Sequence, residues 1–218
     1  MVIITGIGWI TKKEYGGVMQ KLRRDYTDTK SLRSRLQHES VFLYPVKNFG
    51  RFDAVSKMTC CAGALALRDA GITYSEHHKQ DMGILGTNTV SCLESNVHYF
   101  RDYIETGRKI ARGNLFVYTL PSSPLAEAAI AFGLQGPLLY MMFQQNQIPS
   151  LVRCAGKMIL RGETQAMLAV KADENEAVCF VLRREEDVST SRVFSLENAI
   201  ATAQKMSRLE EMIRELTR

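Results

Sequence analysis

The apolar residues of this chain fall into short continuous runs, separated by stretches in which they recur every three or four positions. The runs are rich in aliphatic residues and predict buried strands over 2–7, 82–87, 138–143, 165–171 and 177–183. The periodic stretches between them are typical of amphipathic helices. Strands that alternate with helices predict an α/β protein whose sheet is covered by helices on both faces.

Cap residues and glycines set the limits of the predicted helices. Asp53 is a good N-cap and Gly71 a good terminator, so we expect a helix over 53–70. The other predicted helices are 13–25, 92–106, 124–132, 149–161 and 196–216. An acidic turn at 173–176 predicts a hairpin between the last two strands. The expected architecture is a three-layer α-β-α arrangement with a five-stranded, mainly parallel sheet that contains one antiparallel strand.

After Asp187 the sequence no longer alternates between strand and helix patterns. We expect a main domain over 1–187, followed by an amphipathic helix within 188–218 that packs on it. Ser195 is the predicted cap of this helix. The alternative is that the apolar stripe of the helix docks on a partner chain.

Composition narrows the classes of function. Of 218 residues, 45% are hydrophobic and 23% charged, as in ordinary globular proteins. No apolar run reaches the roughly 20 residues of a membrane-spanning helix, so a cytoplasmic location without a membrane partner is expected. The five cysteines are irregularly spaced, and packing is their expected role. The adjacent His77 and His78 diverge and have no third ligand nearby, so no metal is expected, and no cofactor is expected either.

The net charge of +5 comes from an excess of basic residues near the start of the chain. Residues 1–47 carry nine Lys and Arg residues against four Asp and Glu residues. A mildly basic face of this kind attracts an acidic partner. The charge is too dilute to predict nucleic-acid binding.

Motifs in several segments follow the order found in β-ketoacyl synthases. Residues 2–8 resemble the opening strand of that family, and residues 50–72 resemble its helix that ends in Asp-Ala-Gly. Further similar segments are 83–87, 120–123, 128–137 and 161–163. The resemblance covers about 2–184 and implies the N-terminal half of a thiolase-type fold.

The resemblance also identifies the place of the family's nucleophile. In a working ketosynthase, a cysteine after the corresponding strand carries the acyl chain, activated at a helix N-terminus. Counting from Gly136-Pro137 without a gap puts Gln145 at this place, and an amide cannot attack a thioester. Glutamine there resembles chain-length-factor subunits and loading ketosynthases that only decarboxylate malonyl groups. The residues that follow, Asn146 to Ile148, differ from the small residues usual in both.

The second half of the family pattern has no counterpart in this sequence. That half supplies two catalytic histidines and a glycine-rich loop that completes the oxyanion hole. The histidines of this chain are His38, His77, His78 and His98, and none follows residue 98. The acid–base groups of condensation and decarboxylation are therefore missing.

The apolar run 138–143 is a plain central strand or, by resemblance, an edge strand that pairs with a partner across a two-fold axis. An exposed edge strand this apolar would be prone to aggregate, which favours the interpretation in which a partner strand covers it. The predicted edge residues are Leu138, Leu139, Tyr140, Met141, Met142 and Phe143. Phe116 and Tyr118 lie where family members line an acyl tunnel, although ordinary loop packing explains them equally well.

The predicted helix over 149–161 carries Arg153, Lys157 and Arg161 on one face. In the full family this helix is buried between the two halves, where unpaired cations are costly. We therefore expect this face of the helix to be exposed to solvent in this chain, or to be covered by a segment other than the second half of the family fold. One hypothesis is that the C-terminal helix folds back as a partial lid, held mainly by its apolar stripe and in part by its acidic residues. The acidic residues are Glu197, Glu210, Glu211 and Glu215.

The resemblance implies a non-catalytic, chain-length-factor-like subunit of a fatty-acid or polyketide synthase system. A full-length ketosynthase would be its partner and would supply the cysteine and both histidines, and acyl carrier protein is a second expected partner. One alternative is a self-associating module, a homodimer without acyl chemistry. Another is an enzyme that acts on acyl thioesters through Ser150 or Cys154, although no base stands at a recognisable spacing.

Overall fold

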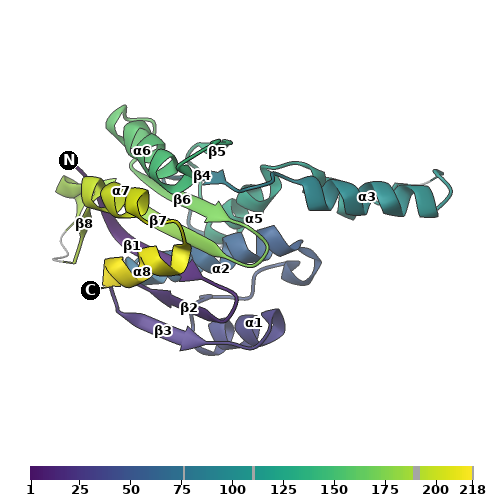
Figure 1. Cartoon of the computed structure of the whole chain (residues 1–218), viewed down its shortest axis with the longest axis horizontal. Coiled ribbons are helices and arrows are strands. Elements are labelled where there is room, and N and C mark those ends of the chain that lie inside the picture. The colour runs from purple at the N-terminus through teal and green to yellow at the C-terminus, as the bar shows by residue number, and fades with distance from the viewer. Residues whose placement is uncertain (76, 110, 189–191, 218) are drawn as a thin grey trace.

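The computed structural model describes residues 1–75, 77–109, 111–188 and 192–217, and within them an eight-stranded sheet runs through the molecule (Figure 1). The strands are β1 (Val2–Ile10), β2 (Glu14–Gly17), β3 (Leu22–Asp25), β4 (Met82–Thr87), β5 (Leu138–Tyr140), β6 (Ala166–Ala172), β7 (Ala177–Arg184) and β8 (Phe194–Ser195). Their order is β3-β2-β1-β7-β6-β4-β5, with β8 paired to β1. The edge of the sheet after β4 is therefore formed by β5.

The five predicted strands are present and run in the predicted directions. β4 is parallel to both β5 and β6, whereas β7 is antiparallel to both β6 and β1. Strands β1, β4, β5 and β6 thus share one direction and β7 opposes them, which confirms a sheet with one antiparallel strand among these five. The whole sheet is larger and more mixed than predicted, because β2, β3 and β8 extend it with further antiparallel pairs.

The helix predicted over 13–25 is wrong, because this segment forms the antiparallel pair β2 and β3. Adjacent glycines disfavour a helix. Gly16 also lies so close to the carbonyl of Leu22 and the ring of Trp9 that a Cβ atom would collide with both. Pairing of β2 with β1 therefore overrides the helical spacing of the apolar residues.

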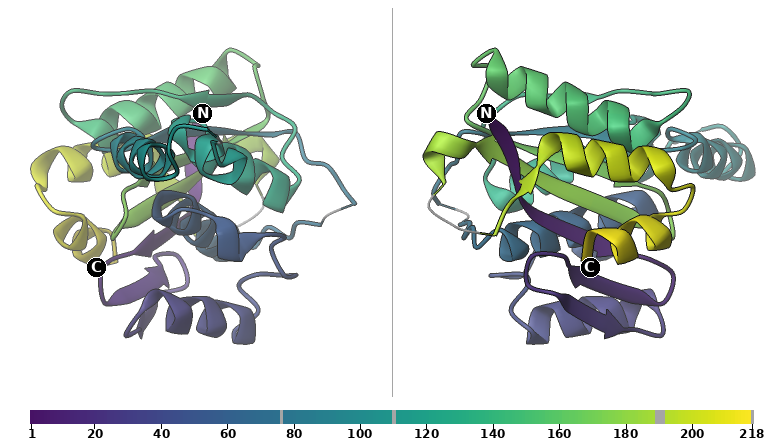
Figure 2. Two further views of the ribbon diagram at one scale, coloured as in Figure 1. Left: turned by 90° about the vertical axis from the view of Figure 1, so that its right-hand side faces the viewer. Right: turned by 60° about the vertical axis from the view of Figure 1, so that its left-hand side comes forward.

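The helices flank the sheet on both faces and give the predicted three layers (Figure 2). The α-helices are α1 (Thr29–His38), α2 (Ala54–Asp69), α3 (Leu93–Glu105), α4 (Gly113–Phe116), α5 (Ser123–Phe132), α6 (Gln147–Leu160), α7 (Leu196–Lys205) and α8 (Leu209–Thr217). Short 3₁₀ helices are η1 (Phe49–Arg51), η2 (Val117–Thr119) and η3 (Glu185–Asp187). Helix α1 lies in a polar stretch for which no element was predicted.

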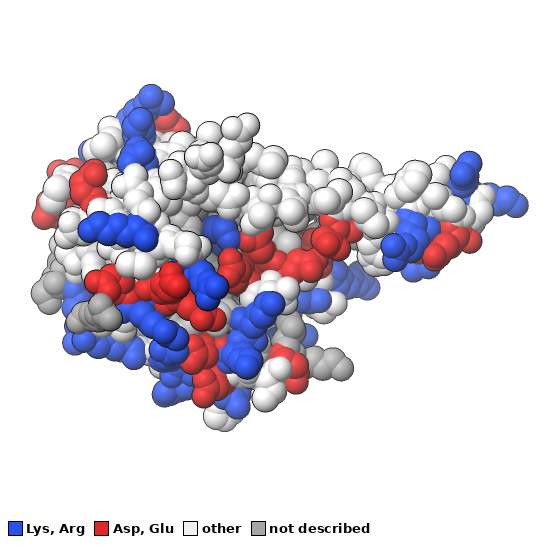
Figure 3. All heavy atoms as spheres, in the orientation of Figure 1, with Lys and Arg blue, Asp and Glu red and all other residues white. Residues whose placement is uncertain are grey.

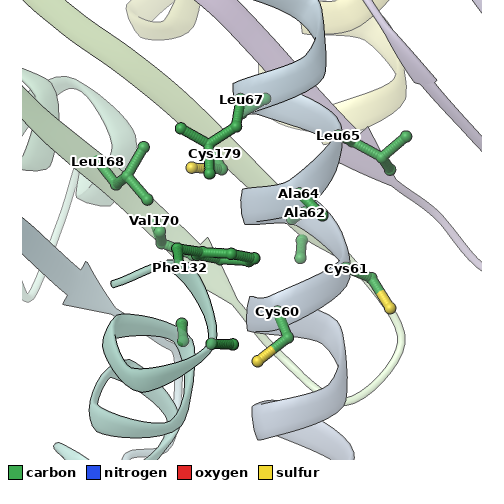
Figure 4. Packing of buried hydrophobic residues seen from close by; sticks show 14 of the residues in the cluster. Cys60, Cys61, Ala62, Ala64, Leu65, Leu67, Phe132, Leu168, Val170 and Cys179 are labelled. Carbon is green, nitrogen blue, oxygen red and sulfur yellow. The ribbon is translucent and has the colours of Figure 1, made fainter. Parts of the chain in front are cut away.

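Two apolar clusters lie on opposite faces of the sheet. Leu168 and Val170 of β6 belong to the cluster with α2 and α5, and the alternate residues Met167 and Ala169 belong to the cluster with α6, α7 and α8. In the first cluster, Phe132 projects from α5 toward α2 (Figure 4). The ring fits against α2 because residue 63 is glycine, where a Cβ atom would lie 2.7 Å from the ring.

The C-terminal segment folds back beside α6 as two helices rather than the single predicted helix. Ser195 caps α7 as predicted, since its Oγ accepts a hydrogen bond from the Asn198 N–H at 3.1 Å. The extended backbone of Met206 ends α7, and α8 then starts at Leu209. The apolar side chains of both helices are buried in the second cluster. They are Ala199, Ile200, Ala203, Leu209, Met212, Ile213 and Leu216.

Helix α3 lies within one residue of its predicted limits at each end, but it does not pack against the sheet as α2, α5 and α6 do. It extends away from the body of the molecule (Figures 1 and 2), and none of its residues is buried. Within the described part of the chain, no single helix has the length and apolar character that crossing a membrane requires. One bent pair, Gly113–Thr119 with Ser123–Phe132, meets the same test by length and composition only.

Candidate functional site

Strand β5 forms one edge of the sheet, where sequence analysis predicted an edge that binds a partner. Within the described sheet it pairs with β4 on one side, with Leu139 opposite Leu85. Only three residues of the predicted run of six are in strand conformation. Met141 continues the contact with β4 by donating its N–H to the Gly86 carbonyl at 2.9 Å. Leu139 and Met142 are exposed, so this chain leaves apolar side chains open at the edge.

A buried asparagine connects the end of β5 with the segments around it. The Tyr140 hydroxyl donates to Asn88 Oδ1 at 2.8 Å, and the Ser91 N–H donates to the same atom at 2.7 Å. The Gln147 amide, at the start of α6, donates to the Asn88 carbonyl at 3.2 Å. Asn88 is only 5% exposed. Sequence analysis missed this residue, although its position just after a buried strand is where polar side chains of α/β sheets gather.

Gln145 lies in the turn between β5 and α6, two residues before the helix begins. The residue after it, Asn146, has the left-handed conformation with φ 50° and ψ 47°. Gln145 is exposed, so its amide does not fill a closed pocket in this chain. The location agrees with a strand-to-helix turn at the predicted place, and the residue offers no nucleophile there.

The groups of the alternative enzyme do not assemble into a nucleophile and base. Ser150 and Cys154 both lie on α6 and are half-buried. The Cys154 sulfur contacts the sulfur of Met141 at 3.7 Å. All four histidines of the chain are exposed, and none lines the cavity described next. Among the described residues, no group of three or more His, Cys, Asp or Glu side chains is placed to hold a metal.

A cavity of about 370 Å³ opens at the carboxyl end of β4. Tyr118 lines it and is buried, with its hydroxyl donating to Glu127 at 3.3 Å. Phe116, the other predicted tunnel residue, is exposed and packs on Tyr99 with 5.7 Å between ring centroids. The structure therefore separates the two residues that sequence analysis grouped.

The cavity is acidic. Its charged lining residues are Lys12, Asp53, Glu94, Asp173, Glu174 and Glu176. Figure 3 shows acidic side chains gathered where α3 leaves the body. Burial raises the pKa of Glu174, and the charges of Glu94 and Asp53 raise it further. The rest of the lining includes the apolar residues Val55, Val90, Leu120 and Pro124 beside Tyr118, so a role of Tyr118 in an acyl tunnel stays a prediction.

Asp173 joins the β6–β7 turn to the loop after β4. Its carboxylate accepts hydrogen bonds from the Lys171 ammonium at 2.7 Å and from the Thr89 N–H at 2.8 Å. Burial acts to raise the pKa of Asp173, but the hydrogen bonds from Lys171 and Thr89 outweigh it and hold the pKa below its ordinary value. The turn between β6 and β7 is therefore held to the loop after β4 by charged hydrogen bonds of Asp173.

Arg153 and Lys157 on α6 and Arg161 at its C-cap are exposed. Contact between α6 and α7 is apolar, with Leu196 so close to Gly156 that a Cβ atom there would lie 2.9 Å from it. The C-terminal segment therefore covers the face of the sheet beside α6, and the cationic face of α6 remains in solvent.

No protein-family model matches this sequence, and no curated protein matches it either. Several solved structures are similar to it. The ishigamide ketosynthase/chain length factor matches with a TM-score of 0.64 and 14% identity, covering 88% of this chain and 64% of that chain. A β-ketoacyl synthase from Burkholderia phymatum matches with a TM-score of 0.54 and 15% identity, covering 85% and 59%.

A third similar structure is a type II polyketide synthase acyl-carrier protein in complex with its ketosynthase, with a TM-score of 0.58 and 10% identity, covering 85% of this chain and 58% of that chain. The chain thus spans less than two thirds of the length of these proteins. Its fold is the thiolase-type fold of ketosynthases.

Proposed function

We propose that this chain, whose fold is that of the ketosynthases, is a non-catalytic, chain-length-factor-like subunit that acts with a full-length ketosynthase in a polyketide or fatty-acid synthase system. The proposal is supported by the exposed position of Gln145 in the turn between β5 and α6, at the place where the resemblance to ketosynthases puts the nucleophile. An amide cannot form the acyl-enzyme, and no histidine follows residue 98 to assist one. In this proposal the partner supplies that chemistry.

The partner binds at the β5 edge. An edge strand leaves one row of N–H and C=O groups unpaired, and proteins normally cover such an edge. Here the neighbouring side chains Leu139 and Met142 are apolar and exposed. A strand from another subunit satisfies the backbone groups and covers these side chains at the same time.

Two features of the similar proteins support this proposal. One is named as a ketosynthase/chain length factor, and another is a ketosynthase in complex with its acyl-carrier protein. Arg23 and Arg24 on the exposed strand β3 are candidate contacts for an acidic carrier protein, although Arg23 already pairs with Glu14 at 2.5 Å. The carrier is therefore the less supported of the two partners.

The test is co-expression of this chain with a full-length ketosynthase encoded in the same genome. We expect a stable complex that extends malonyl units on a carrier protein, whereas this chain alone neither decarboxylates nor condenses them. Leu139→Lys places a charge on the edge and should abolish the complex. Leu160→Lys is the matched control, because Leu160 is an exposed leucine on α6. Turnover by the isolated chain contradicts the proposal, and so does the absence of any complex.

A homodimer through the same edge is the second candidate function. The observation that favours it is the edge itself, since an edge strand can pair in antiparallel fashion with its own copy across a two-fold axis. Sedimentation of the isolated chain distinguishes the two: a dimer that the ketosynthase does not dissociate supports the homodimer.

A further inference from the structure

Helix α3 carries an apolar stripe that the body of the protein leaves uncovered. Leu93, Val97, Phe100 and Ile104 recur four, three and four residues apart and so share one face. Their exposed fractions are 57%, 47%, 60% and 42%, although large apolar side chains of this spacing normally face a core.

The contacts that hold α3 lie mostly on other faces of the helix, where Tyr99 packs on Phe116. The Ser95 hydroxyl donates to Asp53 at 2.9 Å near the start of the helix. Farther along, Asp102 pairs with Arg112 at 3.0 Å. An isolated helix of 13 residues is marginally stable in water, so most of the stability of such a helix comes from packing of its apolar face. Among the residues that the structure describes, the stripe of α3 has no such packing and stays exposed.

The surface area that a stable subunit interface buries indicates which protein covers the stripe. A stable interface buries about 800 Å² on each partner. Strand β5 has three residues, a length of about 10 Å, and cannot supply that area alone. In Figure 3 an uncharged surface continues from the region of β5 toward α3, whereas the charged side chains gather below it and at the far end of α3. The stripe is therefore suited to extend the interface that begins at β5.

The polar side of α3 argues against a lipid surface as the occupant. It carries Glu94, Asp102 and Glu105 against Arg101. Helices that lie on anionic membranes are rich in Lys and Arg on that side. An apolar stripe flanked by acidic residues instead fits a groove on a protein, with Glu94 and Glu105 left in solvent.

We propose that α3 is a docking arm whose stripe of Leu93, Val97, Phe100 and Ile104 inserts into an apolar groove of the same ketosynthase subunit that pairs with β5. This inference rests on the proposed function and adds the second contact that the complex needs. Phe100 is the principal anchor, because it is the most exposed of the four and aromatic residues dominate interface energetics.

The experiment compares two double variants of the full chain in binding to the purified ketosynthase. Val97→Ala with Phe100→Ala shortens the stripe, and His98→Ala with Glu105→Ala alters the reverse side to the same extent. Alanine is the best helix former, so neither variant weakens α3 by propensity. Since none of these side chains is buried in the body, the melting temperature should stay unchanged in both.

We expect the stripe variant to raise the dissociation constant by about tenfold or more, and the reverse-side variant to leave it within about twofold of the unchanged chain. Equal binding by the stripe variant overturns the docking arm but leaves the proposed function intact. Failure of the unchanged chain to bind the ketosynthase overturns the proposed function itself. If the stripe variant abolishes a homodimer instead, the occupant is a second copy and the proposal is wrong.

Discussion

The carboxylate of Asp69 lies against Gly17 so closely that a Cβ atom on that glycine would collide with its Oδ1 atom. Asp69 stands at the end of α2 and accepts hydrogen bonds from the backbone N–H groups of Ile7, Met19 and Gln20, each at 2.9 Å. One buried side chain therefore fixes β1 and the turn between β2 and β3. Burial raises its pKa even though these hydrogen bonds favour the ionised form.

Asp69→Ala should destabilise the protein by about 3 kcal/mol or more, because three backbone N–H groups lose their acceptor and those of Ile7 and Met19 are buried. Asp69→Asn should cost less, since the amide oxygen still accepts the hydrogen bonds of Ile7 and Met19 while its NH₂ group faces the N–H of Gln20. Urea denaturation measures both. Asp25→Ala is the control at an exposed aspartate. A stability of Asp69→Ala within about 0.5 kcal/mol of the unchanged chain contradicts this role.

Asp173 predicts a dependence of stability on pH. Its pKa in the folded protein lies below the ordinary 3.8, so its ionised form contributes stability above that value, and this contribution is lost as the pH falls through the folded pKa. Asp173→Asn should therefore destabilise the protein by about 1 kcal/mol at neutral pH. The difference between variant and unchanged chain should vanish below the folded pKa. A difference that is constant from neutral to acidic pH shows that the effect is not electrostatic.

The cysteines should divide into two groups by reactivity. Cys60, Cys61 and Cys179 are buried, and burial raises the pKa of each, to about 12 for Cys61. Cys92 and Cys154 are partly exposed. Titration with an aromatic disulfide reagent should detect two thiols in the native protein and all five after unfolding. Reaction of a third thiol before unfolding contradicts the packing of the first cluster.

Gln145→Cys tests whether the missing nucleophile is the only missing group. The new thiol is exposed and should react readily with iodoacetamide. It should not take an acyl group from a loaded carrier protein faster than a cysteine in a short peptide does, because no histidine follows residue 98. Mass spectrometry of the acylated protein measures this. Rapid acylation followed by condensation would show that the chain holds its own acid–base group.

Each continuous apolar run contains a strand, because such runs suit strands that are buried on both faces. The run 138–143 is the exception in extent, since only Leu138–Tyr140 is in strand conformation and this edge strand is partly exposed. The spacing of apolar residues failed for 13–25, where Gly16 and Gly17 matter through close approaches that only the folded sheet creates. It also failed at Met206, where the apolar stripe continues across a break in the helix. The spacing of apolar residues indicates which residues are buried, but it does not show whether a single helix continues between them.

The site was predictable only where its residues are consecutive. The edge strand and the turn with Gln145 lie within one short segment, and a resemblance was enough to locate both. The acidic cavity was missed because Asp53, Glu94 and Asp173 come from segments far apart in the sequence. Each of these carboxylates alone is an ordinary surface residue, and only the fold brings them together.

The position of β1 has a consequence for how the protein is made. β1 pairs along most of its length with β7, so Val2 finds its partner Arg184 only after nearly all of the sheet has been synthesised. Sheets that depend on contacts between such distant residues close slowly, and their unpaired apolar strands are prone to aggregate in the meantime. During synthesis, β1 must therefore wait for β7, and chaperones that shield β1 during this interval should raise the yield of folded protein.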